Sequence, residues 1–149
     1  MVSEVLAPPD LIEGSADEGY GKVADAFLGA GSSTTAKFAE AVPIVRREIA
    51  EQGKDPATFR IGKRVYLMID DDSASARERA LDGLHRIYGS MPGVDEVPVS
   101  GTVDDVVAGL REVIDAGAET ILLNPVGRDV AEDREQMERL AAEVIPQLA

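Results

Sequence analysis

The sequence contains no cysteine and no tryptophan, and each absence excludes a class of protein. Without cysteine the chain has no disulfide framework, no thiolate nucleophile and no cysteine-ligated metal site, which fits a reducing compartment. With three Phe and three Tyr, it also has no aromatic platform on which nucleic acid bases would stack. We therefore expect neither a disulfide-stabilised secreted module nor a nucleic-acid-binding domain.

Positive charge and long apolar runs are scarce as well. Fifteen Lys and Arg stand against 28 Asp and Glu, which gives a formal net charge of -13, and such a surface repels nucleic acid phosphates and anionic lipid. No apolar run approaches the roughly 20 residues that span a bilayer. The opening "MVSEVLAPPDLIEG" lacks the basic and apolar regions of a secretory signal. We expect a cytoplasmic protein that binds neither membrane nor nucleic acid.

The sequence does contain alternating apolar segments that are typical of one globular domain. The 149 residues are 44% hydrophobic, enough for a single core. We expect an irregular lead-in over residues 1–21, with a helical turn near 16–22, and one domain over residues 22–149. Within that domain we expect three strands, over 24–28, within "FRIGKRVYLMIDDD" (residues 59–72, with an apolar part at 65–69 and an end at 70–72), and over 119–124. A helix is expected after each, with a further helix that opens at Thr102 after a loop over residues 89–101.

Helical spacing identifies the side chains that should face the core, because residues three and four apart share one face of a helix. The middle strand is apolar on both faces, which is typical of a central parallel strand, and the last strand is also apolar throughout. The predicted inward-facing helix residues are Phe38, Val42, Val45 and Ile49, then Ala76, Ala80, Leu84 and Tyr88, then Val106, Leu110 and Val113, and finally Val130, Met137, Leu140, Val144 and Leu148.

Strands that alternate with helices predict an α/β fold with a parallel sheet. Ligands of such sheets bind at the carboxyl ends of the strands. Three segments of the sequence fall on that edge: residues 29–34, 70–72 and 124–127.

The segment "GAGSST" is the strongest candidate site. Gly29 and Gly31 allow close approach of the backbone to a ligand, and Ser32, Ser33 and Thr34 precede the free amides of a helix, which suit a phosphate or a ring oxygen. The alternative is that the hydroxyls only cap the helix, because "GAGSS" is not a GxGxxG fingerprint.

Other polar residues favour structural roles, with one exception. Asp70, Asp71 and Asp72 are consecutive, so their side chains alternate and cannot converge on one cation; helix capping explains them better, and we predict no metal site. Lys63 and Arg64 precede the apolar part of their strand, toward its amino end, and are expected to be structural or to lie at an interface.

His85 and Asn124 complete the candidates. His85 lies in the middle of a helix without an evident carboxylate partner, and we assign it no catalytic role. For Asn124, which ends an apolar strand at the ligand edge, contact with a cofactor and shaping of the turn into Pro125 stay equally open.

Three consecutive segments carry a resemblance to a known family: "ADAFLGAGSSTTAKFAEAV", "RVYLMIDDDSASARERA" and "GTVDDVVAGLREVIDAGAETILLNPVG". They resemble the C-terminal part of the luciferase-like flavin-dependent monooxygenases. The resemblance implies a partial TIM (β/α)8 barrel, its C-terminal half, in which "ADAFLG", "RVYLMID" and "TILLNP" are late barrel strands. It also implies FMN or F420 as cofactor and a small-molecule substrate. The cofactor-binding residues would be Gly29, Gly31, Ser32, Ser33, Thr34 and Asn124.

The chain departs from that family in length, since a complete barrel takes about 250 residues. We therefore expect either a homodimer or a partner chain that completes the barrel. The leading hypothesis is a flavin-dependent oxidoreductase or monooxygenase, or its C-terminal portion, with no acid or base assigned. The alternative is a non-catalytic flavin-binding or assembly module built from half of the barrel, and a remnant without any ligand is a third hypothesis.

Overall fold

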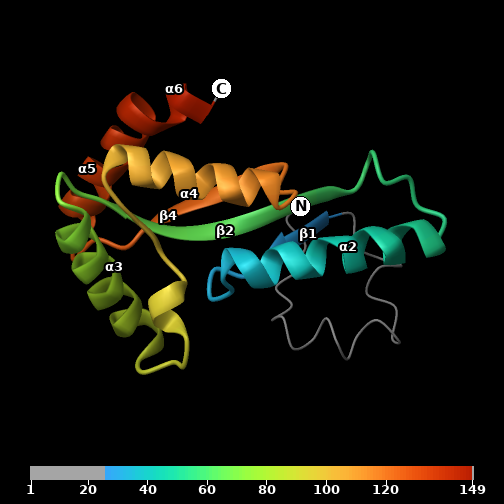
Figure 1. The fold of residues 1–149 in the computed structure, drawn as a ribbon, viewed down its shortest axis with the longest axis horizontal. Coiled ribbons are helices and arrows are strands. Elements are labelled where there is room, and N and C mark those ends of the chain that lie inside the picture. Colours follow the sequence, from blue (N-terminus) through green and yellow to red (C-terminus); the bar gives the residue numbers. More distant parts are fainter. Residues whose placement is uncertain (1–25, 149) are drawn as a thin grey trace. The chain divides into compact units, whose positions relative to one another are not determined.

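The computed structural model describes residues 26–148, which form a parallel α/β fold (Figure 1). The predicted lead-in and its helical turn lie outside the described residues. The chain divides into two compact units, one of residues up to Arg64 with Val113–Leu122 and one of Val65–Glu112 with the residues from Leu123 onward. The elements in chain order are β1 (Ala26–Gly29), α2 (Thr35–Glu51), β2 (Arg60–Ile69), α3 (Ser73–Tyr88), η2 (Val94–Glu96), β3 (Val99–Gly101), α4 (Val103–Asp115), β4 (Thr120–Pro125), α5 (Val130–Arg139), η3 (Leu140–Val144) and α6 (Ile145–Leu148).

The first unit is built on the parallel pairing of β1 with the start of β2. The register places Ala26 beside Arg60 and Gly29 beside Lys63, and α2 covers this pair (Figure 1). The apolar face of α2 buries Phe38, Val42 and Ile49, as the helical spacing predicts. Gly53, with a positive φ of 69°, ends the helix where the sequence places a stop.

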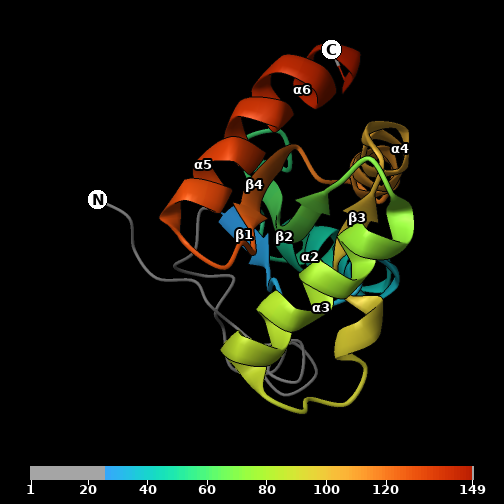
Figure 2. The same ribbon diagram turned by 90° about the vertical axis from the view of Figure 1, so that its left-hand side faces the viewer.

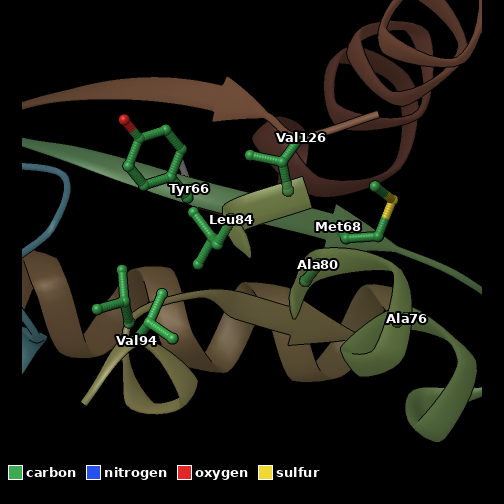
Figure 3. Close-up of a cluster of buried hydrophobic side chains, with 8 residues drawn as sticks. Tyr66, Met68, Ala76, Ala80, Leu84, Val94 and Val126 are labelled. Carbon is green, nitrogen blue, oxygen red and sulfur yellow. The ribbon is translucent and has the colours of Figure 1, made fainter. Parts of the chain in front are cut away.

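The second unit contains a cluster of buried side chains between the second half of β2 and α3 (Figure 3). Ala76, Ala80 and Leu84 of α3 are completely buried against it, which confirms the predicted face of this helix. Alanine at two of these positions leaves little side chain between the helix backbone and the strands, so the helix can approach closely. The other members of the cluster are Tyr66, Met68, Val94, Val97 and Val126.

Strand β2 is the central strand of the four-stranded sheet. It pairs in parallel with β1 at its start and with β3 at its end, and β4 pairs with it as well. Every residue from Val65 to Ile69 is buried, which confirms the prediction of a strand that is covered on both faces. The strand runs over Arg60–Ile69, with Lys63 and Arg64 in its first half ahead of the apolar part, as predicted.

Strand β4 forms where the sequence predicts an apolar strand, but none of its residues is fully buried. Its exposure alternates along the chain, and Leu122 is 43% exposed. Successive side chains of a strand point to opposite faces, and the described residues cover only one of the two faces here.

The prediction of a loop over residues 89–101 is also wrong in part. Residues Val94–Glu96 form a 3-10 turn and Val99–Gly101 form strand β3, so the described sheet has four strands rather than three. A segment of three residues that follows a proline and ends in a glycine is too short to show the alternation of side chains that identifies a strand in a sequence. Pairing with β2 in the second unit, rather than local preference, makes this segment a strand.

The last helical segments, α5, η3 and α6, follow one another without interruption (Figure 2). Leu140 and Val144 are buried as predicted, but Val130 and Met137 are 85% and 61% exposed. Glu132 and Gln136 are buried in their place, because they share the i, i+4 spacing of Leu140 and Val144. The inward face of this helix is thus polar in its first half.

Helix ends follow the predicted capping chemistry. Thr34 caps α2 by accepting from the Lys37 N–H, and Asp72 caps α3 by accepting from the Ser75 N–H. At the start of α4, the Thr102 N–H donates to Asp105 and the Asp105 N–H donates to the Thr102 hydroxyl, which is a capping box with aspartate in place of glutamate.

None of the helices in residues 26–148 has the length and apolarity that crossing a bilayer requires.

Gly83 of α3 gives a test of this packing. A Cβ at position 83 would lie 2.4 Å from the Val126 carbonyl oxygen and 2.7 Å from Val126 Cβ. Gly83→Ala should therefore destabilise the protein by about 2 kcal/mol, although alanine in an unobstructed helix position stabilises by about 0.5–1 kcal/mol. Urea unfolding measures the change. The control is Asp82→Ala, which alters the adjacent exposed residue. A variant Gly83→Ala as stable as wild type contradicts the packing described here.

Candidate functional site

The segment that follows β1 is a tight turn. The Ser33 N–H donates to the Ala30 carbonyl oxygen over 3.1 Å, and Thr34 caps α2 directly afterwards. Gly31 and Ser33 are buried, whereas Ser32 is partly exposed. One turn therefore contains both the predicted helix cap and the predicted ligand-binding residues. Thr34 caps α2, and Ser32 is partly exposed to solvent, where a ligand would bind.

Packing against Phe38 explains why residue 29 is a glycine. A Cβ at this position would lie 2.6 Å from Cδ2 of Phe38, and Phe38 stacks on Phe27 with the ring centroids 6.2 Å apart. The absence of a side chain at Gly29 thus allows the α2 aromatic ring to reach the strand. Neither Gly29 nor Gly31 has a positive φ. Gly29 is explained by packing, and the hydroxyls and amides are the groups of this turn that suit a ligand.

Lys63 lies in the amino-terminal half of β2, as predicted, but the inference that this keeps it away from the candidate ligand turn is wrong. The register pairs its backbone with Gly29 at the carboxyl end of β1. Its amine donates to the Ser33 carbonyl oxygen over 2.7 Å and to the Ala30 carbonyl oxygen over 3.3 Å. Burial of this amine lowers the pKa of Lys63 to about 8. Lys63 thus has a structural role, and it has that role at the turn.

The neighbouring Arg64 is partly buried, and its Nε makes no hydrogen bond to the part of the chain that the structure describes.

In the second unit, Asn124 lies near the end of β4 and is partly buried. Its Nδ2 donates to the Pro125 carbonyl oxygen over a long 3.4 Å, so the amide is only weakly held by the turn. The following loop is fixed more firmly. Arg86 donates to the Gly127 carbonyl oxygen over 2.9 Å, and the Gly127 N–H donates to Asp133 over 2.7 Å.

An ionic network joins the end of β2 to the starts of α3 and α5 in this second unit. The Arg79 guanidinium forms ion pairs with Asp70 and with Glu132. Glu132 also accepts from the N–H and the side chain of Arg128. Because the Glu132 carboxylate is only 8% exposed, these partners replace the water that it loses.

The pKa values of the two carboxyl groups follow from this arrangement. For Glu132, desolvation raises the pKa, but the hydrogen bonds from the Arg128 N–H and from Arg79 outweigh it and lower the pKa to about 2. For Asp70, desolvation is likewise opposed by the hydrogen bond from Arg79, and the pKa lies below its ordinary value. Both groups are therefore carboxylates at neutral pH, with neither poised as a general acid.

The remaining candidates have structural partners. Asp72 caps α3 as predicted, and Asp71 pairs with Arg139 over 2.9 Å. Within residues 26–148, no group of three or more His, Asp and Glu side chains could hold a metal ion. His85 is half-exposed on α3 and lies 3.8 Å from Asp95, a carboxylate that the sequence did not indicate.

Sequence reasoning missed Arg79, Glu132 and Gln136. Gln136 is 1% exposed, accepts from the Ile69 N–H over 2.7 Å and donates to the Ile69 carbonyl oxygen over 3.0 Å. The signal that could have found two of them is the spacing of Glu132 and Gln136 with Leu140 and Val144. The six predicted cofactor-binding residues fall in different units: Gly29 to Thr34 in the first, Asn124 in the second.

Comparison with known proteins identifies the family. A model of the luciferase-like monooxygenases matches residues 16–144. The chain belongs to this family. No curated protein matches the chain.

Solved structures with the luciferase-like fold resemble the chain closely in shape. The coenzyme F420-dependent tetrahydromethanopterin reductase from Methanopyrus kandleri has a TM-score of 0.69 at 19% identity, over 95% of this chain and 49% of that one. An F420-dependent secondary alcohol dehydrogenase has a TM-score of 0.70 at 15% identity, over 93% and 46%. Monooxygenase RslO1 from Streptomyces bottropensis has a TM-score of 0.64 at 17% identity, over 95% and 46%. The predicted fold class, α/β and part of a TIM barrel, is confirmed. The chain spans about half the length of these structures.

The Glu132 network predicts an acid-sensitive contribution to stability. Because the folded pKa of about 2 lies below the ordinary value of 4.5, the contribution is complete above pH 4.5 and is lost as the pH falls toward 2. Glu132→Gln should therefore lower the free energy of unfolding at pH 7 by about 2–4 kcal/mol, and the difference from wild type should shrink between pH 4.5 and 2. Urea unfolding over this pH range measures it. The control is the exposed Glu135→Gln on the same helix. An equal effect of both substitutions contradicts the network.

Proposed function

We propose that this luciferase-like chain binds a flavin-type cofactor, FMN or F420, and is an oxidoreductase of that class or the C-terminal portion of one. The family and its F420- and flavin-dependent structural relatives support the general class. In such enzymes the cofactor carries the redox chemistry and the protein binds and orients it. We propose that residues 29–34 of the first unit bind the cofactor and, as a separate proposal, that Asn124 of the second unit contacts a flavin-type cofactor. The substrate would be a small molecule.

The residues at the turn fit an anionic oxygen of such a cofactor. The turn leads directly into the first amides of α2, where the helix dipole favours negative charge. The Ser32 hydroxyl makes no hydrogen bond to any residue between 26 and 148, and the exposed Lys37 supplies a positive charge in the first turn of the helix. A phosphate or an acidic ring oxygen would find donors of the right kind here.

One observation carries the proposal. Hydrogen bonds from the buried Lys63 amine to the Ala30 and Ser33 carbonyl oxygens hold the turn at the carboxyl end of β1, while Ser32 is partly exposed. A turn that only needed to cap α2 would require Thr34 and nothing more. A turn whose backbone is already ordered loses little conformational entropy when a ligand binds. The Ser32 hydroxyl, which has no partner among residues 26–148, can then donate to that ligand.

A second candidate function is a non-catalytic flavin-binding or assembly module. The chain covers only 40–49% of its structural relatives, and the pKa values of Asp70, Asp105 and Glu132 all lie below their ordinary values, so none of these three carboxyl groups is poised as a general acid. This candidate shares the binding site and differs in turnover. Assays with reduced FMN and reduced F420 separate the two, since the module would bind but not oxidise either cofactor.

A titration of the purified protein with FMN and with F420 tests the binding proposal. Fluorescence of each cofactor should change with a Kd below about 1 mM. Ser32→Ala should weaken the interaction by about three- to tenfold, as expected for the loss of one hydrogen bond to a charged group. Ser90→Ala, which removes an exposed serine hydroxyl from the loop after α3, is the matched control. No fluorescence change with either cofactor refutes the proposal.

We also propose that the chain works with a partner, either a second copy of itself or a chain that completes the barrel. The 43% exposed Leu122 on β4 supports this, because an uncovered apolar strand tends to associate. Sedimentation velocity at about 10 μM should show a species of at least twice the 15.8 kDa monomer mass. Leu122→Asp should shift the distribution toward the monomer, and Thr58→Asp, at another exposed position, should not. A folded wild-type monomer contradicts association with a second copy, and only a different partner chain then remains.

A further inference from the structure

The Lys63 amine is a buried charge whose hydrogen bonds all go to backbone carbonyls of one small region. Its acceptors are the carbonyl oxygens of Ser33 at 2.7 Å, Ala30 at 3.3 Å and Arg64 at 3.5 Å. Ala30 and Ser33 are the two residues that close the turn through their own hydrogen bond of 3.1 Å. One ammonium group with three donors thus ties the turn to β2 at both of its ends.

We propose that Lys63 is the positioning residue of the cofactor turn. It holds residues 29–34 in the conformation that binds the anionic part of the flavin-type cofactor, without touching the cofactor itself. The inference rests on the proposed function and adds to it a residue that was expected to be structural or to lie at an interface.

The cost of this lysine supports a role beyond simple filling of the core. Lys63 is 3% exposed, and no described carboxylate forms an ion pair with it. Partial compensation comes from the carbonyls and from the Phe38 ring, whose centroid lies 5.7 Å from Nζ. An apolar residue would avoid the cost of burying a charge but would leave the Ala30 and Ser33 carbonyls without this donor. Lys63 therefore makes the core less stable than an apolar residue would, but its hydrogen bonds fix the conformation of the turn.

The same arrangement makes the turn sensitive to pH. Burial lowers the pKa of Lys63 to about 8, so the amine loses a proton within reach of neutral pH. The neutral amine has two donors for three carbonyls and turns a lone pair toward the third. The groups packed against Nζ are the turn carbonyls, the Phe38 ring of α2 and the main chain of Arg64 on β2. The adjacent charged side chain on β2 is that of Arg64, and the group whose pKa lies near 8 is Lys63.

The test compares FMN binding by wild type, Lys63→Met, Lys63→Arg and the control Lys54→Met from about pH 7 to about pH 9. Lys63→Met keeps most of the length of the side chain and removes the donors. It should bind FMN about tenfold more weakly at pH 7, while Lys54→Met should match wild type. Wild-type affinity should fall as the pH rises through about 8. Lys63→Arg should recover part of the affinity and show no such fall, because arginine keeps its proton.

A separate measurement isolates the turn from ligand binding. Amide hydrogen exchange of residues 30–35 in the folded protein should be about tenfold faster in Lys63→Met than in Lys54→Met. Unchanged exchange overturns the inference. So does unchanged FMN affinity of folded Lys63→Met, or wild-type affinity that is flat across pH 8. If wild type binds neither FMN nor F420, the proposed function fails, and the exchange comparison still decides whether Lys63 holds the turn.

Discussion

The burial of β2 on both faces is the constraint on which the rest of the structure depends. A strand in this position cannot send any backbone N–H or carbonyl group to water, so every one needs a protein partner. β1 supplies partners along the first half, β3 along the second, and β4 pairs with the strand as well. Where strand partners run out, at Ile69, the side-chain amide of Gln136 takes both hydrogen bonds. The Asp70 N–H then donates to the Gly101 carbonyl oxygen.

The polar groups that are buried near β2 obey the same rule. Lys63 is matched by backbone carbonyls, and Glu132 by the Arg79 and Arg128 donors. In each case the buried group joins segments that are distant in sequence within one unit: Lys63 joins β2 to the turn after β1, and Arg79 joins the end of β2 to the start of α5. These buried polar side chains thus fix the position of the loops at the carboxyl edge of the sheet, where ligands of this fold bind.

The sequence was a good guide wherever one local rule decided the outcome. The faces of α2, α3 and α4 follow helical spacing, and Thr34 and Asp72 cap as their residue types predict. It was a poor guide where a tertiary contact decided. β3 is a strand because β2 lies beside it, and α5 turns Glu132 and Gln136 inward because Arg79 and the Ile69 backbone offer partners. The position of Lys63 depended on the strand register, which apolar patterning does not reveal when a strand begins with charged residues.

Gln136 recognises the peptide group of Ile69 and not its side chain. Every residue except proline presents the same donor and acceptor at that point. The hydrogen bonds between Gln136 of α5 and the end of β2 therefore do not depend on which apolar side chain occupies position 69. They are sensitive instead to register, since an insertion or deletion within the strand would bring a different peptide group, turned to the opposite side, under the amide. This contact therefore constrains the length of the strand, while the packing of the core constrains its buried side chains.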